Sequence, residues 1–170
     1  MEKPKTYTSP FGKAIYPHLN KVDTYKTNGD KFKEKYHVKI EFSTNDAKEI
    51  IKQSDEALKV ALAEEKEQSK SKKPLKTSEF LGYSKEGDKV IVHFKMKAHG
   101  KNNRTNETFS QKPALFDNEL KPLDPELQIW GGSNLRVSYT PKGWYSSMLG
   151  GAGVTFRLKS VQVKDLVQGS

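Results

Sequence analysis

Four stretches of the chain alternate apolar and polar residues, which is the pattern of β-strands with one buried face. They are YHVKIEF at 36–42, VIVHFKM at 90–96, LRVSY at 135–139 and VTFRL at 154–158. After the last stretch the apolar residues move to odd positions, at Val161 and Val163. Such a change of parity within one strand predicts a β-bulge. Weaker strand patterns lie at 12–16, 107–111 and 127–130.

One segment, at about 45–68, has the apolar spacing of a long amphipathic helix, with Ser43 or Thr44 as the expected N-cap. The stripe expected to face the core consists of Ile50, Ile51, Ser54, Leu58, Ala61 and Leu62. Pro74 and the Ser/Lys content around it predict a linker at about 69–79. Many short strands with a single helix predict a mainly β protein, either a small barrel or a sandwich.

A length of 170 residues favours one domain over 1–170, with a flexible N-terminal arm at 1–8 and a free end at 167–170. We find no apolar run of the kind that spans a membrane or forms a signal peptide, so no membrane association is expected. The chain has no cysteine, which excludes disulfides, thiol nucleophiles and thiolate metal sites.

The formal net charge of +9 is unevenly distributed along the chain. Residues 46–67 hold seven acids and four lysines, whereas 89–106 and 127–164 hold no acid. The basic residues of these two acid-free windows are Lys89, Lys95, Lys97, Lys101, Arg104, Arg136, Lys142, Arg157, Lys159 and Lys164. Windows of one sign favour a polyanionic partner, with a generally basic surface as the alternative interpretation.

The strand alternation also predicts which side chains point away from the core. The outward basic residues and histidines are His37, Lys39, His93, Lys95, Arg136 and Arg157, which together predict a cationic sheet face. The segment SYTPKGWYSSMLGGAGVTF at 138–156 places Trp144 and Tyr145 beside Lys142 among turn-forming residues, so we expect an aromatic loop at 141–151. Trp130, before Gly-Gly-Ser, is a second exposed aromatic candidate.

The sequence lacks the usual signatures of catalysis. His18, His37, His93 and His99 have no metal-ligand spacing, and no P-loop, GxGxxG or GxSxG motif occurs. Most acids lie away from the cationic windows, so we expect no catalytic residue, no metal, no cofactor and no enzymatic activity. A metal-dependent nuclease is the enzymatic alternative, and His93 is interpreted as a phosphate or solvent contact.

Basic grooves combined with aromatic platforms are typical of proteins that bind single-stranded nucleic acid without sequence preference. The segment WGGSNLRVSYTPKGWYSSMLGGAGVTFRLKSVQVKDL at 130–166 resembles the C-terminal half of the single-stranded DNA-binding proteins of short-tailed bacteriophages. SPFGKAIYPHLNKVDT at 9–24, the strand at 36–42, the helix and KKPLK at 72–76 follow in the same order as in that family. The resemblance implies an OB-fold, a partly open five-stranded β-barrel with additional strands and one long helix.

The resemblance also implies a function: coating single-stranded DNA during phage replication and recombination, and annealing complementary strands. It places Arg136, Tyr139, Lys142, Trp144 and Tyr145 toward DNA, with Lys95, Lys97 and Arg157 as backbone contacts. Together with the charge pattern, the full predicted DNA-binding set is Lys39, His93, Lys95, Lys97, Lys101, Arg104, Trp130, Arg136, Tyr139, Lys142, Trp144, Tyr145, Arg157 and Lys159.

The expected setting is the cytoplasm of the bacterial host, with the protein as a monomer or homodimer. The replicative DNA polymerase and the helicase-primase are the family's protein partners, recruited through an acidic C-terminal tail. This chain stops at DLVQGS without that tail, as a tailless relative or a shortened form, which weakens the expectation of those partners. The alternatives are an OB protein that binds single-stranded RNA and a non-catalytic module that binds an acidic protein.

Overall fold

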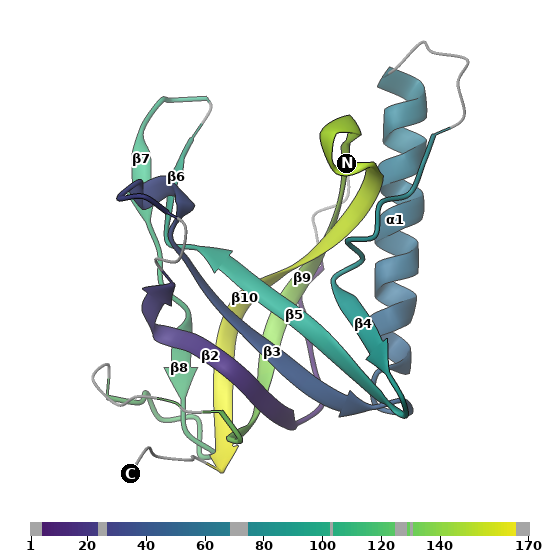
Figure 1. Ribbon diagram of the computed structural model, residues 1–170. Helices are drawn as coiled ribbons and strands as arrows, with labels where there is room; N and C mark the ends of the chain where they lie inside the picture. Colours follow the sequence, from purple (N-terminus) through teal and green to yellow (C-terminus); the bar gives the residue numbers. More distant parts are fainter. Residues whose placement is uncertain are drawn as a thin grey trace.

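Five strands form a ring (Figure 1). Buried apolar side chains form a single core cluster. The computed structural model describes residues 5–23, 27–68, 75–102, 104–124, 129 and 131–165. The neighbours around the ring are β2 (Gly12–Asp23), β3 (Lys35–Ser43), β5 (Lys89–Lys97), β10 (Gly151–Asp165) and β9 (Asn134–Ser146), which returns to β2. The β2–β9 and β5–β10 contacts have two residue pairs each, so the ring is only partly closed. This is the predicted OB-fold barrel.

Shorter elements extend the barrel. β1 (Tyr7–Thr8) pairs with β9, β4 (Tyr83–Glu86) with β5, and β8 (Ala114–Phe116) runs parallel to β10. β6 (His99–Lys101) and β7 (Thr108–Ser110) form a separate hairpin that projects from one side of the barrel (Figure 1). Single 3-10 turns occupy Lys31–Lys33 and Ser147–Leu149. Because β1 lies within the predicted N-terminal arm, residues 7 and 8 belong to the sheet and not to a free end.

The helix α1 (Lys48–Gln68) follows β3 in the chain and packs against β9 and β10. It begins three residues after the predicted start, behind a turn in which the Asp46 N–H donates to Ser43 Oγ at 3.1 Å. Gly143 of β9 permits the contact, since a Cβ at this position would collide with the carbonyl oxygen of Ala57. Within the described residues, no helix is both long enough and apolar enough to cross a membrane.

The four strong strand predictions are confirmed in β3, β5, β9 and β10. The predicted bulge is confirmed too, because the β9–β10 register shifts between Leu158 and Ser160. The weaker patterns at 12–16 and 107–111 coincide with the start of β2 and with β7, while the one at 127–130 lies largely outside the described residues. Hydrophobic periodicity was therefore sufficient to find four of the five ring strands, and it marked only the start of the fifth, β2.

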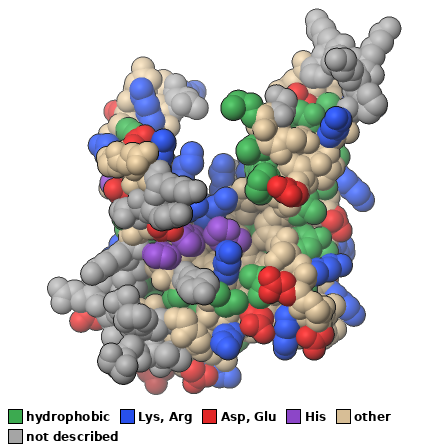
Figure 2. Space-filling view, in the orientation of Figure 1, with side chains coloured by type: hydrophobic (Ala, Val, Ile, Leu, Met, Phe, Trp, Pro, Cys, Tyr) green, Lys and Arg blue, Asp and Glu red, His purple; other side chains and the backbone are tan. Residues whose placement is uncertain are grey.

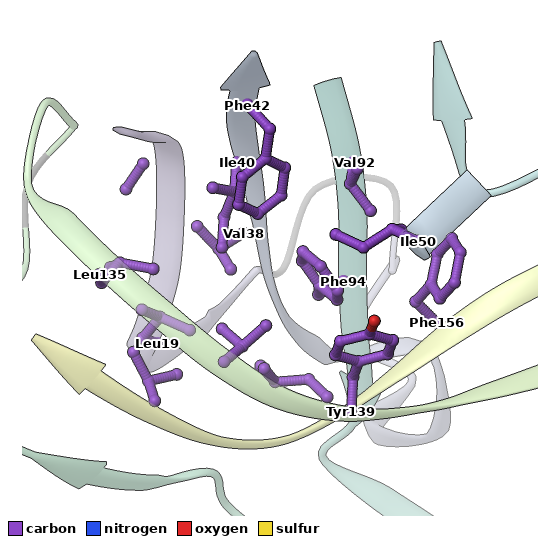
Figure 3. Close-up of a cluster of buried hydrophobic side chains, with 14 of the residues drawn as sticks. Leu19, Val38, Ile40, Phe42, Ile50, Val92, Phe94, Leu135, Tyr139 and Phe156 are labelled. Carbon is purple, nitrogen blue, oxygen red and sulfur yellow. The ribbon is translucent and has the colours of Figure 1, made fainter. Parts of the chain in front are cut away.

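The core corrects one site prediction, because Tyr139 lies inside the barrel and is 1% exposed (Figure 3). Its ring packs against Phe94 and Phe156, with centroid distances of 5.1 and 5.5 Å. Its hydroxyl donates a hydrogen bond to Gln53 Oε1 of α1, and burial raises the pKa of this phenol well above its usual value. A ring enclosed in this way cannot stack on a base, so the prediction that Tyr139 binds DNA is wrong.

We predict that Tyr139→Phe lowers the free energy of unfolding by about 1 kcal/mol, because the Gln53 amide loses its phenol partner inside the protein. The measurement is urea denaturation followed by circular dichroism. Tyr145→Phe is the matched control, since Tyr145 is half-buried and no hydrogen bond of its hydroxyl is found among the described residues. Equal losses in the two variants would contradict the assignment.

Candidate nucleic-acid interface

A groove of about 630 Å³ lies on the outer face of β3 and β5. Its floor contains Lys39 of β3 with His93 and Lys95 of β5. Figure 2 shows Lys and Arg side chains gathered in the hollow between the β6–β7 hairpin and the part of the molecule formed by α1 and the β9–β10 hairpin, with histidines below them. The floor of the groove therefore carries two lysines beside the His93 ring.

The walls of the groove differ from its floor. Three large apolar side chains, those of Phe80, Trp144 and Leu149, lie along it, and Phe80 and Leu149 are 46% and 51% exposed. Two acidic residues also line the groove: Glu79, which precedes β4, and Glu86, the last residue of β4. The groove thus combines two lysines and two glutamates with the exposed Phe80 ring and the half-buried Trp144 ring.

Strand register extends the cationic floor across the sheet. Lys39 stands opposite His93 and His37 opposite Lys95 in the β3–β5 pair, and Lys95 stands opposite Arg157 in the β5–β10 pair. Directly opposite residues share one face of a sheet. The exposed Arg157 therefore continues the row of cations beyond the groove itself.

The cations of this face have no acidic partners within the described part of the chain. None of its ion pairs includes Lys39, Lys95 or Arg157. Burial, followed by repulsion from Lys35, lowers the pKa of Lys95 from its ordinary value. Like charges held close together favour the binding of an anion, because the anion relieves their repulsion.

His93 is an uncharged member of the floor. Burial, followed by the charges of Lys95, His37 and Lys35, lowers its pKa to about 3, so the ring is neutral near pH 7. Its Nε2 is buried and has no hydrogen-bond partner among the described residues. The predicted phosphate contact through His93 therefore depends on a neutral N–H donor and not on an imidazolium ion.

Trp144 is held in a fixed position at the groove. Its indole Nε1 donates to Thr155 Oγ1 at 3.0 Å, across the β9–β10 ladder. The ring lies over Gly153, where any Cβ would collide with it. This glycine therefore provides the space for the ring, and the ring needs little ordering when it meets a ligand.

The structure corrects the prediction of an aromatic loop at 141–151. β9 continues to Ser146 and β10 begins at Gly151, so only residues 147–150 turn between them. Trp144 thus sits on a paired strand, and Tyr145 is directed to the opposite face by the strand alternation. The glycine and serine content suggested a pliant segment, but the backbone hydrogen bonds of the ladder make it regular.

The remaining predicted residues fall into two groups. Lys142 is exposed and pairs with Thr155, so it shares the face of Trp144. Four others are exposed beyond the groove, at the end of β5, on the β6–β7 hairpin and at the β10 bulge: Lys97, Lys101, Arg104 and Lys159.

Arg136 and Trp130 stand apart from this set. Arg136 does not line the groove: its Nε donates to Gln162 Oε1 at 2.7 Å, and its guanidinium lies 4.7 Å from the centroid of the Phe11 ring. Trp130 lies outside the described residues.

Sequence reasoning missed Phe80 and Leu149 in the groove wall and Phe109, which is 46% exposed on β7. Each is a large apolar residue in or beside a turn-rich segment, outside the strong strand patterns. A large apolar residue among turn-forming residues was therefore the signal that could have identified them, and the same signal identified Trp144.

Comparisons with known proteins place the chain in one family. Residues 12–166 match the family described as the single-stranded DNA-binding protein of bacteriophage T7. The chain is 30% identical to the single-stranded DNA-binding protein of Enterobacteria phage T3, over 96% of this chain and 77% of that protein. These relatives are DNA-binding proteins, which confirms the expectation of a non-enzymatic protein.

Solved structures confirm the fold. The crystal structure of gp2.5, a single-stranded DNA-binding protein of bacteriophage T7, matches with a TM-score of 0.82 and 22% identity, over 99% of this chain and 90% of that one. The single-stranded DNA-binding protein of bacteriophage Enc34, in complex with single-stranded DNA, matches with a TM-score of 0.58 and 17% identity, over 96% and 88%. The family match and the phage T3 relative confirm the resemblance noted in the sequence, and the chain belongs to the bacteriophage T7 single-stranded DNA-binding protein family.

Proposed function

We propose that this protein binds single-stranded DNA without sequence preference in the groove on β3 and β5. The observation that carries the proposal is the placement of unpaired cations, Lys39 and Lys95, beside a fixed indole, Trp144. The cations match the phosphate backbone, and the indole matches the flat face of a base. Neither contact depends on the identity of the base.

The same groove favours unpaired strands over duplex DNA. In a duplex the base faces are stacked on one another and unavailable to Trp144, whereas phosphates are present in both forms. Stacking is thus the contact that distinguishes the two ligands. The family membership and the Enc34 protein described in complex with single-stranded DNA support this ligand.

The wider biological role is proposed from the family alone. It comprises protection of single strands in phage replication and recombination, strand annealing, and action in the cytoplasm of the bacterial host. Contacts with the replicative polymerase and the helicase-primase belong to the same proposal. Protection and annealing of single strands both depend on the DNA contact.

We predict that Trp144→Ala weakens the affinity for a dT oligomer by about 1–3 kcal/mol, because one base loses its stacking platform. The measurement is fluorescence anisotropy of a labelled oligomer. Tyr145→Ala is the matched control, as it removes the neighbouring aromatic from the opposite strand face and is expected to change the affinity less. An unchanged affinity with a lowered melting temperature in Trp144→Ala would assign this ring to packing alone.

Salt dependence tests the cationic floor. For single strands, log affinity falls with log salt at a slope of about −0.7 per neutralised phosphate. We predict that Lys95→Ala and Arg157→Ala each make this slope shallower by about 0.7. Lys52→Ala is the control, since Lys52 is exposed on α1 and does not line the groove. Identical slopes in all three variants and the unmodified protein would contradict phosphate contacts at this face.

Competition experiments separate the alternative ligands. Unlabelled single-stranded DNA should displace the labelled oligomer at lower concentration than duplex DNA or matched RNA. Displacement by RNA at lower concentration would favour the RNA-binding alternative, since only contacts to the 2′-hydroxyl distinguish the two. Equal displacement by duplex would indicate a purely electrostatic surface.

A further inference from the structure

Three potential metal ligands meet at the edge of the cationic face. His18 and Asp23 of β2 and His37 of β3 each offer a nitrogen or oxygen atom, and these atoms lie within 4.8 Å of one another. The rings of His18 and His37 are 4.7 Å apart between centroids. His37 Nε2 and Asp23 Oδ2 are 2.7 Å apart.

An irregularity in the sheet creates this cluster. His18 pairs with His37, and Asp23 pairs with Lys35. Between these two pairs β2 therefore advances by five residues and β3 by only two. The surplus residues of β2 bulge out of the ladder and bring Asp23 back to the ring of His37. No metal-ligand spacing occurs in the sequence, because the two histidines meet only through strand pairing. The expectation of no metal site rested on that spacing, on the absence of cysteine and on the position of most acids away from the cationic windows.

We propose that His18, Asp23 and His37 bind a divalent transition-metal ion, with Zn²⁺ as the representative case. Two imidazoles and one carboxylate form a donor set found in zinc sites that keep a fourth position for water. Imidazole nitrogen suits Zn²⁺, Co²⁺ and Ni²⁺ better than it suits Mg²⁺ or Ca²⁺, which prefer oxygen ligands. The site therefore selects transition metals over alkaline-earth ions.

A plain hydrogen bond between His37 and Asp23 does not account for the whole arrangement. That bond uses Nε2 of His37, while its Nδ1 is buried without a hydrogen-bond partner among the described residues. It also does not involve the ring of His18, whose centroid lies 4.7 Å from that of His37. A metal ion shared by both rings and the carboxylate gives the three groups a common partner.

Nearby positive charge sets the expected affinity and selectivity. Lys35 stands opposite Asp23, and Lys95 stands opposite His37, so both repel a cation at this position. One carboxylate offsets only part of this repulsion. Binding must therefore come from the nitrogen–metal bonds, which Mg²⁺ cannot form to a comparable extent.

The test is a titration of the full chain, freed of metal by chelator and dialysis, with Zn²⁺ in a calorimeter and in the absence of DNA. We expect saturable binding of one ion per chain and none with Mg²⁺. His18→Gln and Asp23→Asn should each weaken Zn²⁺ binding by about tenfold or more. His99→Gln is the matched control, since His99 lies 3.6 Å from the Glu34 carboxylate outside the cluster and its loss should leave the affinity unchanged.

Absence of saturable Zn²⁺ binding by the unmodified protein would overturn the proposal, and so would unchanged affinity in both cluster variants. If a variant lost its native circular dichroism, Co²⁺ absorption of the unmodified protein would decide the question. Intense visible bands would support a protein-held ion of low coordination number, and the weak spectrum of hydrated Co²⁺ would overturn it. Because DNA is absent, failure here leaves the DNA-binding proposal intact, and the reverse also holds.

Discussion

The pairing of β9 with β10 is the interaction on which both the barrel and the groove depend. Its register runs from Ser146 opposite Gly151 to Asn134 opposite Asp165. One side of β10 gives Phe156 to the core, while the other side presents Thr155, which anchors the Trp144 indole. One ladder thus serves both faces. The bulge after Leu158 then returns the later part of β10 to the core in the opposite parity.

The groove concentrates like charge directly above this core. Lys39 and Lys95 lie on strands whose opposite faces carry the fully buried Val38 and Phe94. The apolar side therefore holds the strands together while the cations on the other side repel one another. His93 avoids adding to that repulsion because burial keeps it neutral. Stability and binding are in this way assigned to opposite faces of the same strands, as expected where a binding surface carries strain.

Local pattern and long-range pairing explain what the sequence could and could not reveal. Alternation identified four of the five ring strands and the bulge, and in LRVSY at 135–139 it puts Tyr139 on the same strand face as the apolar Leu135 and Val137. The family resemblance assigned the same residue to DNA, and the structure follows the alternation, because strand parity acts on every side chain. The groove wall around Phe80 and the meeting of His18 with His37 arise from contacts between separate segments. No local period encodes such contacts, and glycine content misled at 141–151 because ladder hydrogen bonds outweighed turn propensity.

The histidine cluster and the groove are electrostatically linked, because His37, Lys95 and Arg157 occupy one row across the sheet. A cation bound at the cluster adds positive charge to the row and makes phosphate binding more favourable. Linkage requires DNA to raise the metal affinity by the same factor. DNA has this effect because phosphates that neutralise Lys95 remove a charge that opposes the metal. Such coupling weakens as salt rises. Coupling of the opposite sign, insensitive to salt, would instead mean that metal binding alters the path of β2 and narrows the groove.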